Sequence, residues 1–178
     1  MNIVTLGQAD LAAFFLYMND HLSDNGRGDT ALFQPMPRSE SFFPSDREEA
    51  FRAGLATPLG EAGWRRAWIA LDMDGMIAGH VDLRARPERT AAHRCLLGMG
   101  VHRAHRKAGL GTRLLDTAYA WALNVEALEW IDLEVLSLNG AARALYERNA
   151  FVKTGEIPAL FRLNGEDLAY TYMTRKLG

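Results

Sequence analysis

The pattern of apolar and polar positions predicts a chain in which helices and strands alternate. After a short apolar segment at 3–6 that predicts a strand, apolar residues recur at helical spacing over 11–22. Ser45 to Glu48 has the spacing of a capping box and predicts the start of a second helix. Between these helices, residues 25–43 show no periodicity. Because loops of this length in compact domains are usually functional or mobile, we expect this one to form a lid over the substrate.

Two hairpin signals flank the middle of the chain. Apolar runs meet at Asp74-Gly75 within residues 67–83, and a second pair of runs meets at Asn164-Gly165. Between the hairpins, the pattern predicts in order a strand, a helix, a strand and a short helix, at 95–101, 110–121, 130–137 and 139–151. Central alternation with hairpins on either side predicts an α/β (α+β) fold, in which a mixed sheet has helices on both faces.

Composition limits the class of protein. The 178 residues fit a single domain, and a net charge of −2 gives the whole chain no attraction to nucleic acid or to an anionic membrane. The single cysteine, Cys95, cannot form an internal disulfide, which is typical of a reducing compartment. The N-terminal region has no basic stretch before its apolar residues, so we expect neither a signal peptide nor a membrane span. The expected location is the cytoplasm.

The segment HRKAGLGTRLL, residues 105–115, combines two glycines with cationic side chains at the start of a helix. Glycine allows backbone amides to approach a ligand closely, and the first-turn amides of a helix lack partners within it. With the helix dipole, these amides favour a phosphate group. Five side chains would add positive charge around it: His102, Arg103, His105, Arg106 and Lys107. The alternative is a tight turn with solvated cations.

Two motifs on these elements resemble those of the GNAT superfamily of acetyl-CoA-dependent N-acetyltransferases. The first is R-x-x-G-x-G, from Arg106 to Gly111, and the second is N-x-x-A-x-x-L-Y, from Asn139 to Tyr146. The resemblance implies a mostly antiparallel sheet whose central parallel pair of strands is splayed. It also implies one domain with a substrate-side N-terminal part (1–66), an acetyl-CoA-binding core (67–151) and a C-terminal hairpin (152–178).

The resemblance also implies which residues contact acetyl-CoA as a co-substrate. Backbone groups of Met99, Gly100 and Val101 would pair with the pantetheine arm, which would account for the glycines of this strand. The pyrophosphate would lie on the loop formed by Arg106, Lys107, Ala108, Gly109, Leu110, Gly111 and Thr112. Asn139 would contact the cofactor arm, and asparagine also favours the N-cap of a helix, so the two roles are compatible.

Two residues carry the catalysis that the resemblance implies. Tyr146 matches the tyrosine that protonates the departing thiolate, which a phenol of pKa about 10 can do at neutral pH. Glu134 lies on the polar face of the strand 131–135 and resembles the general base of the N-terminal-alanine acetyltransferases of ribosomal proteins. The alternatives are a tyrosine that only packs in the core and a carboxylate at a solvated strand end.

The sequence departs from the family pattern in two places. The carboxylate that the family often carries on the strand before the phosphate loop is replaced by Leu96, and the usual Gly-Phe appears as Ala150-Phe151. We expect Asn149 to take the left-handed conformation in place of alanine.

His102 and His105 are spaced like metal ligands, but no further ligand cluster accompanies them, so we expect no metal.

The sequence therefore predicts transfer of acetyl to a primary amine of a small molecule or peptide, by direct attack in a ternary complex. The alternative is a non-catalytic acyl-CoA-binding or sensing module on the same fold. A nucleic-acid partner is disfavoured by the net charge, no membrane partner is expected, and a homodimer stays open.

Overall fold

The computed structural model describes residues 1–178 and contains one sheet of seven strands. The strands are β1 (Asn2–Thr5), β2 (Arg65–Leu71), β3 (Ile77–Ala85), β4 (Arg94–Val101), β5 (Trp130–Leu136), β6 (Val152–Leu163) and β7 (Glu166–Lys176). Their order across the sheet is β1-β2-β3-β4-β5-β7-β6. Only β4 and β5 pair in parallel, and every other neighbouring pair is antiparallel. The predicted mixed, mostly antiparallel sheet is confirmed.

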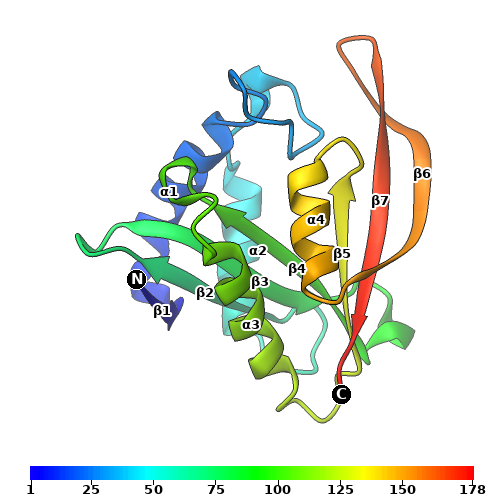
Figure 1. The fold of residues 1–178 in the computed structure, drawn as a ribbon. Helices are drawn as coiled ribbons and strands as arrows, with labels where there is room; N and C mark the ends of the chain where they lie inside the picture. Colours follow the sequence, from blue (N-terminus) through cyan, green and yellow to red (C-terminus); the bar gives the residue numbers. More distant parts are fainter.

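Four helices cover the two faces of this sheet. They are α1 (Leu11–Ser23), α2 (Ser45–Ala56), α3 (Leu110–Ala122) and α4 (Gly140–Arg148). Figure 1 shows α3 and α4 in front of the sheet, with α2 behind it. The hairpin of β6 and β7 and the loop between α1 and α2 both project at the top of this view.

Two hydrophobic cores hold the layers together because the side chains of a strand alternate between its faces. On β2, Trp68 and Ala70 belong to the larger core with α3, whereas Ala67 and Ile69 belong to the smaller core with α1 and α2. The hairpin turn predicted at Asp74-Gly75 lies between β2 and β3, as expected.

On the face of α1 and α2, strands β5 and β7 carry polar side chains. We call this surface the polar face; it consists of Asp132, Glu134, Tyr170, Tyr172 and Thr174. The opposite face of β5 carries Ile131, Leu133 and Val135, which all belong to the larger core. The predicted division of this strand into an apolar and a polar face is confirmed.

Two local predictions are wrong. Helix α2 begins at Ser45, but Pro44 is its N-cap and no side chain caps it. At the end of α4, Ala150 takes the positive φ of 62°, whereas Asn149 stays at −101°. Asn149 is held to the helix because its side chain donates to the Leu145 carbonyl at 2.8 Å. The turn away from the helix therefore falls on alanine.

The loop between α1 and α2 is organised around one buried side chain. Asn25 is fully buried, and its Oδ1 accepts from the backbone amides of Phe33 and Gln34, while its Nδ2 donates to Gln34 O and to Ser41 Oγ. This one amide fixes the chain over residues 25–41.

None of the helices has both the length and the apolar composition that a membrane span requires.

Asp132, on β5, links four segments at the end of the sheet where β4 and β5 are paired, which we call the closed end of the parallel pair. Its carboxylate accepts from Arg86, which follows β3, from Arg94 on β4, and from Thr174 on β7. Burial raises the pKa of Asp132, but these hydrogen bonds outweigh the burial and hold the pKa below its usual value. The ionised carboxylate is therefore the form that the fold stabilises.

We expect Asp132→Asn to destabilise the protein at pH 7 by roughly 2–4 kcal/mol, since the half-buried guanidinium groups of Arg86 and Arg94 lose a shared, buried counterion. Because folding lowers the pKa of Asp132, its carboxylate contributes its full stabilisation above the pKa of the unfolded state, about 3.9. This stabilisation is lost as the pH falls through the pKa of the folded state. Urea unfolding should show that the free energies of unfolding of wild type and Asp132→Asn differ less at pH 3 than at pH 7. Asp167→Asn, which breaks an exposed ion pair with Arg162, is the control and should have little effect. If this difference in unfolding free energy does not change with pH, the ionised Asp132 carboxylate is not what stabilises the fold.

Candidate functional site

The centre of the site is the place where β4 and β5 separate. Their parallel pairing covers three positions and ends at Leu96 opposite Asp132. Beyond this point, β4 continues to pair with β3 as far as Val101, and β5 continues to pair with β7 as far as Leu136. The edges that the two strands turn toward each other therefore have no strand partner. Such edges can form hydrogen bonds with an extended ligand.

Met99, Gly100 and Val101 lie on the open part of β4, as the resemblance implied. The Val101 carbonyl already accepts from Arg106 Nε at 3.1 Å, and the Gly100 carbonyl lies 3.4 Å from the Tyr17 hydroxyl. Side chains thus hold the end of β4 in position from two directions.

The loop after β4 presents a continuous row of free backbone amides. From Lys107 to Thr112, no amide donates to another atom of the chain, and the first amide that does so is that of Arg113, to Gly109 O. Gly109 is the N-cap of α3 with a left-handed φ of 77°, and Lys107 also has a positive φ. Successive amides of this kind, at the positive end of a helix dipole, form an anion site. The predicted loop residues are brought together here.

The cationic side chains before α3 have a different role from the expected one. Four of the five are bound to acids of other segments: His102 and Arg103 to Asp20, His105 to Asp72, and Arg106 to Asp24. These pairs join the loop to α1, to the start of the loop after α1, and to the turn between β2 and β3. The expectation that all five charges surround the phosphates therefore differs from the structure. Lys107 is the one cation of the five without an ionic partner.

At three glycines of the site, neighbouring side chains occupy the space that a Cβ would need. A Cβ at Gly111 would lie 2.8 Å from Leu145 Cδ2, so this glycine lets α3 and α4 approach each other. A Cβ at Gly98 would lie 2.6 Å from Asp82 Oδ1, and one at Gly100 would lie 2.5 Å from His21 Nε2. These contacts explain the glycines of β4 without the cofactor arm.

Tyr146 lies on α4 and is buried in the larger core, with its ring edge-on to Phe151 at 5.8 Å. Burial raises the pKa of its phenol above the usual value, so the hydroxyl carries its proton at neutral pH. This hydroxyl has no hydrogen-bond partner in the chain, and it is not among the fully enclosed polar atoms. Asn139 caps α4, because its Oδ1 accepts from the Ala142 amide at 3.2 Å. The N-cap role predicted for Asn139 is confirmed.

Glu134 is exposed on the polar face, directly across from Tyr172 on β7. Its carboxylate has no hydrogen-bond or ionic partner, whereas the neighbouring Asp132 is fully paired. The tyrosines beside it form a row in which Tyr170 lies edge-on to both Tyr172 and Phe161. Glu134 is thus the free carboxylate of this surface.

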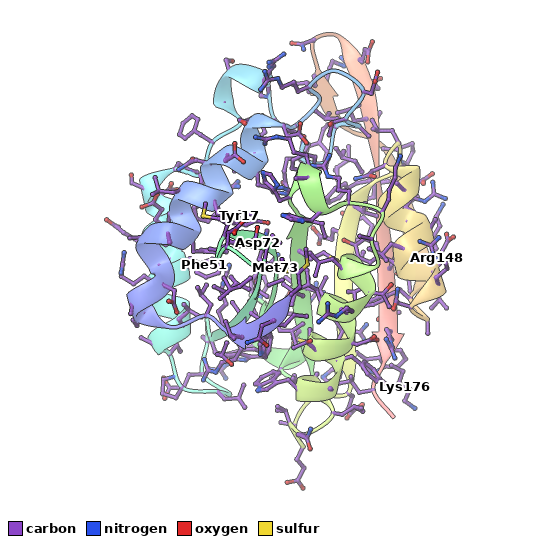
Figure 2. The ribbon with its side chains drawn as sticks, turned by 60° about the vertical axis from the view of Figure 1, so that its left-hand side comes forward. Tyr17, Phe51, Asp72, Met73, Arg148 and Lys176 are labelled. Carbon is purple, nitrogen blue, oxygen red and sulfur yellow. The ribbon has the colours of Figure 1, made fainter.

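A buried cluster on α1 and β3 was missed by sequence reasoning. The Tyr17 hydroxyl lies 3.0 Å from His80 Nδ1, and the His21 ring stacks against Tyr17 and Phe33. Figure 2 shows Tyr17 on the side of α1 that is turned toward the sheet. Burial lowers the pKa of His21 to about 3 and that of His80 to about 4, so both rings are neutral. The available signal was the spacing of Tyr17 and His21, four residues apart on the apolar side of a helix.

Comparison with known proteins decides the family. The model of the acetyltransferase (GNAT) family matches residues 32–151. The chain belongs to this family. The prediction of GNAT membership is thereby confirmed.

Relatives and solved structures agree with this assignment. The chain is 33% identical over 100 residues to the N-terminal acetyltransferase A complex catalytic subunit NAA10 of Arabidopsis thaliana, a match that covers 56% of this chain and 52% of that protein. The chain thus spans about half the length of this relative. Among solved structures, an acetyltransferase of the GNAT family from Streptococcus pneumoniae has a TM-score of 0.80 at 23% identity over 99% of both chains.

A second solved structure shares the fold. A phosphinothricin acetyltransferase from Sinorhizobium meliloti, solved in complex with acetyl-CoA, has a TM-score of 0.77 at 21% identity, covering 99% of this chain and 88% of that one. No group of three or more metal-ligating side chains occurs in the structure described here.

Proposed function

We propose that this protein transfers acetyl from acetyl-CoA to a primary amine of a small molecule or peptide, by direct attack in a ternary complex. The proposal rests on two features at the same end of the sheet, the edge of β4 that has no strand partner beyond Leu96 and the free amides of residues 107–112. The amides would hold the pyrophosphate, and the open edge at Met99, Gly100 and Val101 would pair with the pantetheine arm. In this arrangement the thioester lies in the gap between β4 and β5.

The two proposed catalytic residues lie on opposite faces of the sheet. Tyr146 belongs to the core of α3 and α4, whereas Glu134 lies on the polar face. An amine that arrives over the polar face meets Glu134 first. Glu134 removes a proton from the substrate's ammonium group, directly or through water, because only the neutral amine is nucleophilic. Attack on the thioester carbon gives a tetrahedral oxyanion, which backbone N–H groups near Val101 stabilise.

Collapse of this intermediate breaks the bond between carbon and sulfur. The thiolate of coenzyme A leaves on the side of α4, where the Tyr146 hydroxyl has its proton and no protein partner. Transfer of this proton gives the free thiol. The attacking nitrogen, which became cationic on forming the new bond, loses its extra proton to water, and water returns a proton to the Tyr146 oxygen. The products are the N-acetylated amine and coenzyme A. The cytoplasmic location, the homodimer and the division of the chain at residues 66 and 151 stay predictions.

Tyr146→Phe keeps the ring packed against Phe151 and removes only the proton donor. We therefore expect kcat to fall by ~10²–10⁴-fold, while the affinity for acetyl-CoA changes little. The measurement is free-thiol release from acetyl-CoA with a panel of primary amines, together with calorimetric titration of acetyl-CoA. A kcat within about threefold of wild type, well below that range, would make Tyr146 structural. Binding of acetyl-CoA with no turnover on any amine would favour the acyl-CoA-binding module.

Glu134→Gln keeps the shape of the side chain and removes its basicity. If Glu134 accepts the substrate proton, the acidic limb of the pH–rate profile should disappear or shift, with acetyl-CoA affinity preserved. Glu147→Gln is a matched control, since Glu147 is an exposed glutamate on α4 outside the polar face. A profile identical to that of wild type would assign the proton to another group or to solvent.

A further inference from the structure

A cavity of about 360 Å³ opens on the polar face, next to the point where β4 and β5 separate. The charged side chains that line it are those of Arg86, Glu88, Arg94, Asp132 and Glu134, and Thr154 and Tyr172 add hydroxyl groups. It thus extends from the proposed base toward the closed end of the parallel pair. A lining of this kind suits a charged ligand better than an apolar one.

The two ends of this cavity differ in charge. At one end, the Glu134 carboxylate has no partner. At the other end, Arg86 and Arg94 share a single buried carboxylate, that of Asp132. Glu88, at the rim, also pairs with Arg86 at 3.1 Å. The two guanidinium groups are thus balanced by two carboxylates, and what this end offers to a ligand is their remaining N–H donors.

The arginine end of the cavity is also rigid. Arg94 donates to Asp132 and to Thr174 Oγ1, and its guanidinium lies 4.9 Å from the centre of the Trp130 ring. Asp132 in turn positions Arg86, which stays 24% exposed and keeps donors free for a ligand. A preorganised pair of guanidinium groups is well matched to a carboxylate or a similar planar anion.

We propose that the acceptor is zwitterionic: a primary amine that also carries a carboxylate, with the ammonium toward Glu134 and the carboxylate toward Arg86 and Arg94. This inference rests on the proposed function and adds the substrate class. An acceptor without an acidic group leaves the free guanidinium donors without an acceptor oxygen, and a diamine places a second cation against the two guanidinium groups. Charge complementarity at both ends therefore selects one orientation, with the amine at the gap between the strands.

The carboxylate can belong to a free amino acid or to a peptide whose side chain is acidic, and two sets of probes separate these sources. The first compares L-alanine with L-alaninamide, with rates expressed per neutral amine. The second compares the C-terminally amidated dipeptides Ala-Glu, Ala-Gln and Ala-Lys. In at least one set, we expect the carboxylate-bearing acceptor to have a kcat/KM higher by ~10-fold or more than its amide counterpart, the range of a hydrogen bond to a charged group.

Charge reversal at Arg86 identifies the recognition site. Arg86→Glu should remove the preference for the carboxylate and, in the dipeptide set, favour Ala-Lys over Ala-Glu. Arg89→Glu makes the same change of charge at an exposed residue outside the cavity lining and should keep the wild-type preference. Should circular dichroism show that Arg86→Glu is unfolded, Arg86→Gln replaces it, with a reduced preference expected.

Equal rates for acids and amides in wild type, or an unchanged preference in the Arg86 variants, would overturn the inference. Failure of every amine to release thiol, with acetyl-CoA bound, would instead overturn the proposed function.

Discussion

The whole site depends on one constraint: strands β4 and β5 pair over three residues and then separate. A backbone N–H or C=O that lies inside a protein without a partner is costly, so an open sheet edge in the middle of a fold needs another source of hydrogen bonds. The closed end is fixed by Asp132, which gathers Arg86, Arg94 and Thr174 around one carboxylate. Past this point, β3 and β7 hold the two strands from outside, and the gap between them is left for a ligand.

The cationic side chains before α3 connect the loop of free amides to other segments of the chain. Arg106 accounts for three contacts: it donates to Val101 O at the end of β4, pairs with Asp24 at 2.6 Å, and lies 3.4 Å from Thr30 Oγ1. It thereby joins the loop of free amides to the loop between α1 and α2, which would border the acceptor. With most of the positive side chains used in such pairs, the attraction for phosphate comes mainly from backbone amides and the helix dipole, which need no long side chain to be ordered.

Much of this architecture could be predicted from the sequence because it depends on local signals. The Asn164-Gly165 turn, the N-cap at Asn139 and the two-faced strand around Glu134 each follow from a short pattern with a direct physical cause. The remainder could not be predicted, because it depends on residues far apart in the chain. No local pattern shows that Arg106 pairs with Asp24, or that Gly100 makes room for His21. The positive φ of Ala150 was missed for a related reason: Asn149 is held to the helix by its side-chain bond to Leu145.

The most direct test of the account is the affinity for coenzyme A of two variants at Gly109. No atom lies within 4 Å of a Cβ placed there, so a longer side chain has space, and its backbone strain at φ 77° is the same for Glu and Gln. The account predicts that calorimetry finds coenzyme A binding by Gly109→Gln within about tenfold of wild type, and by Gly109→Glu weaker by ~100-fold or more, since a carboxylate would face the phosphates across free amides. Equal affinities in two folded variants would contradict the assignment of residues 106–112 to the pyrophosphate.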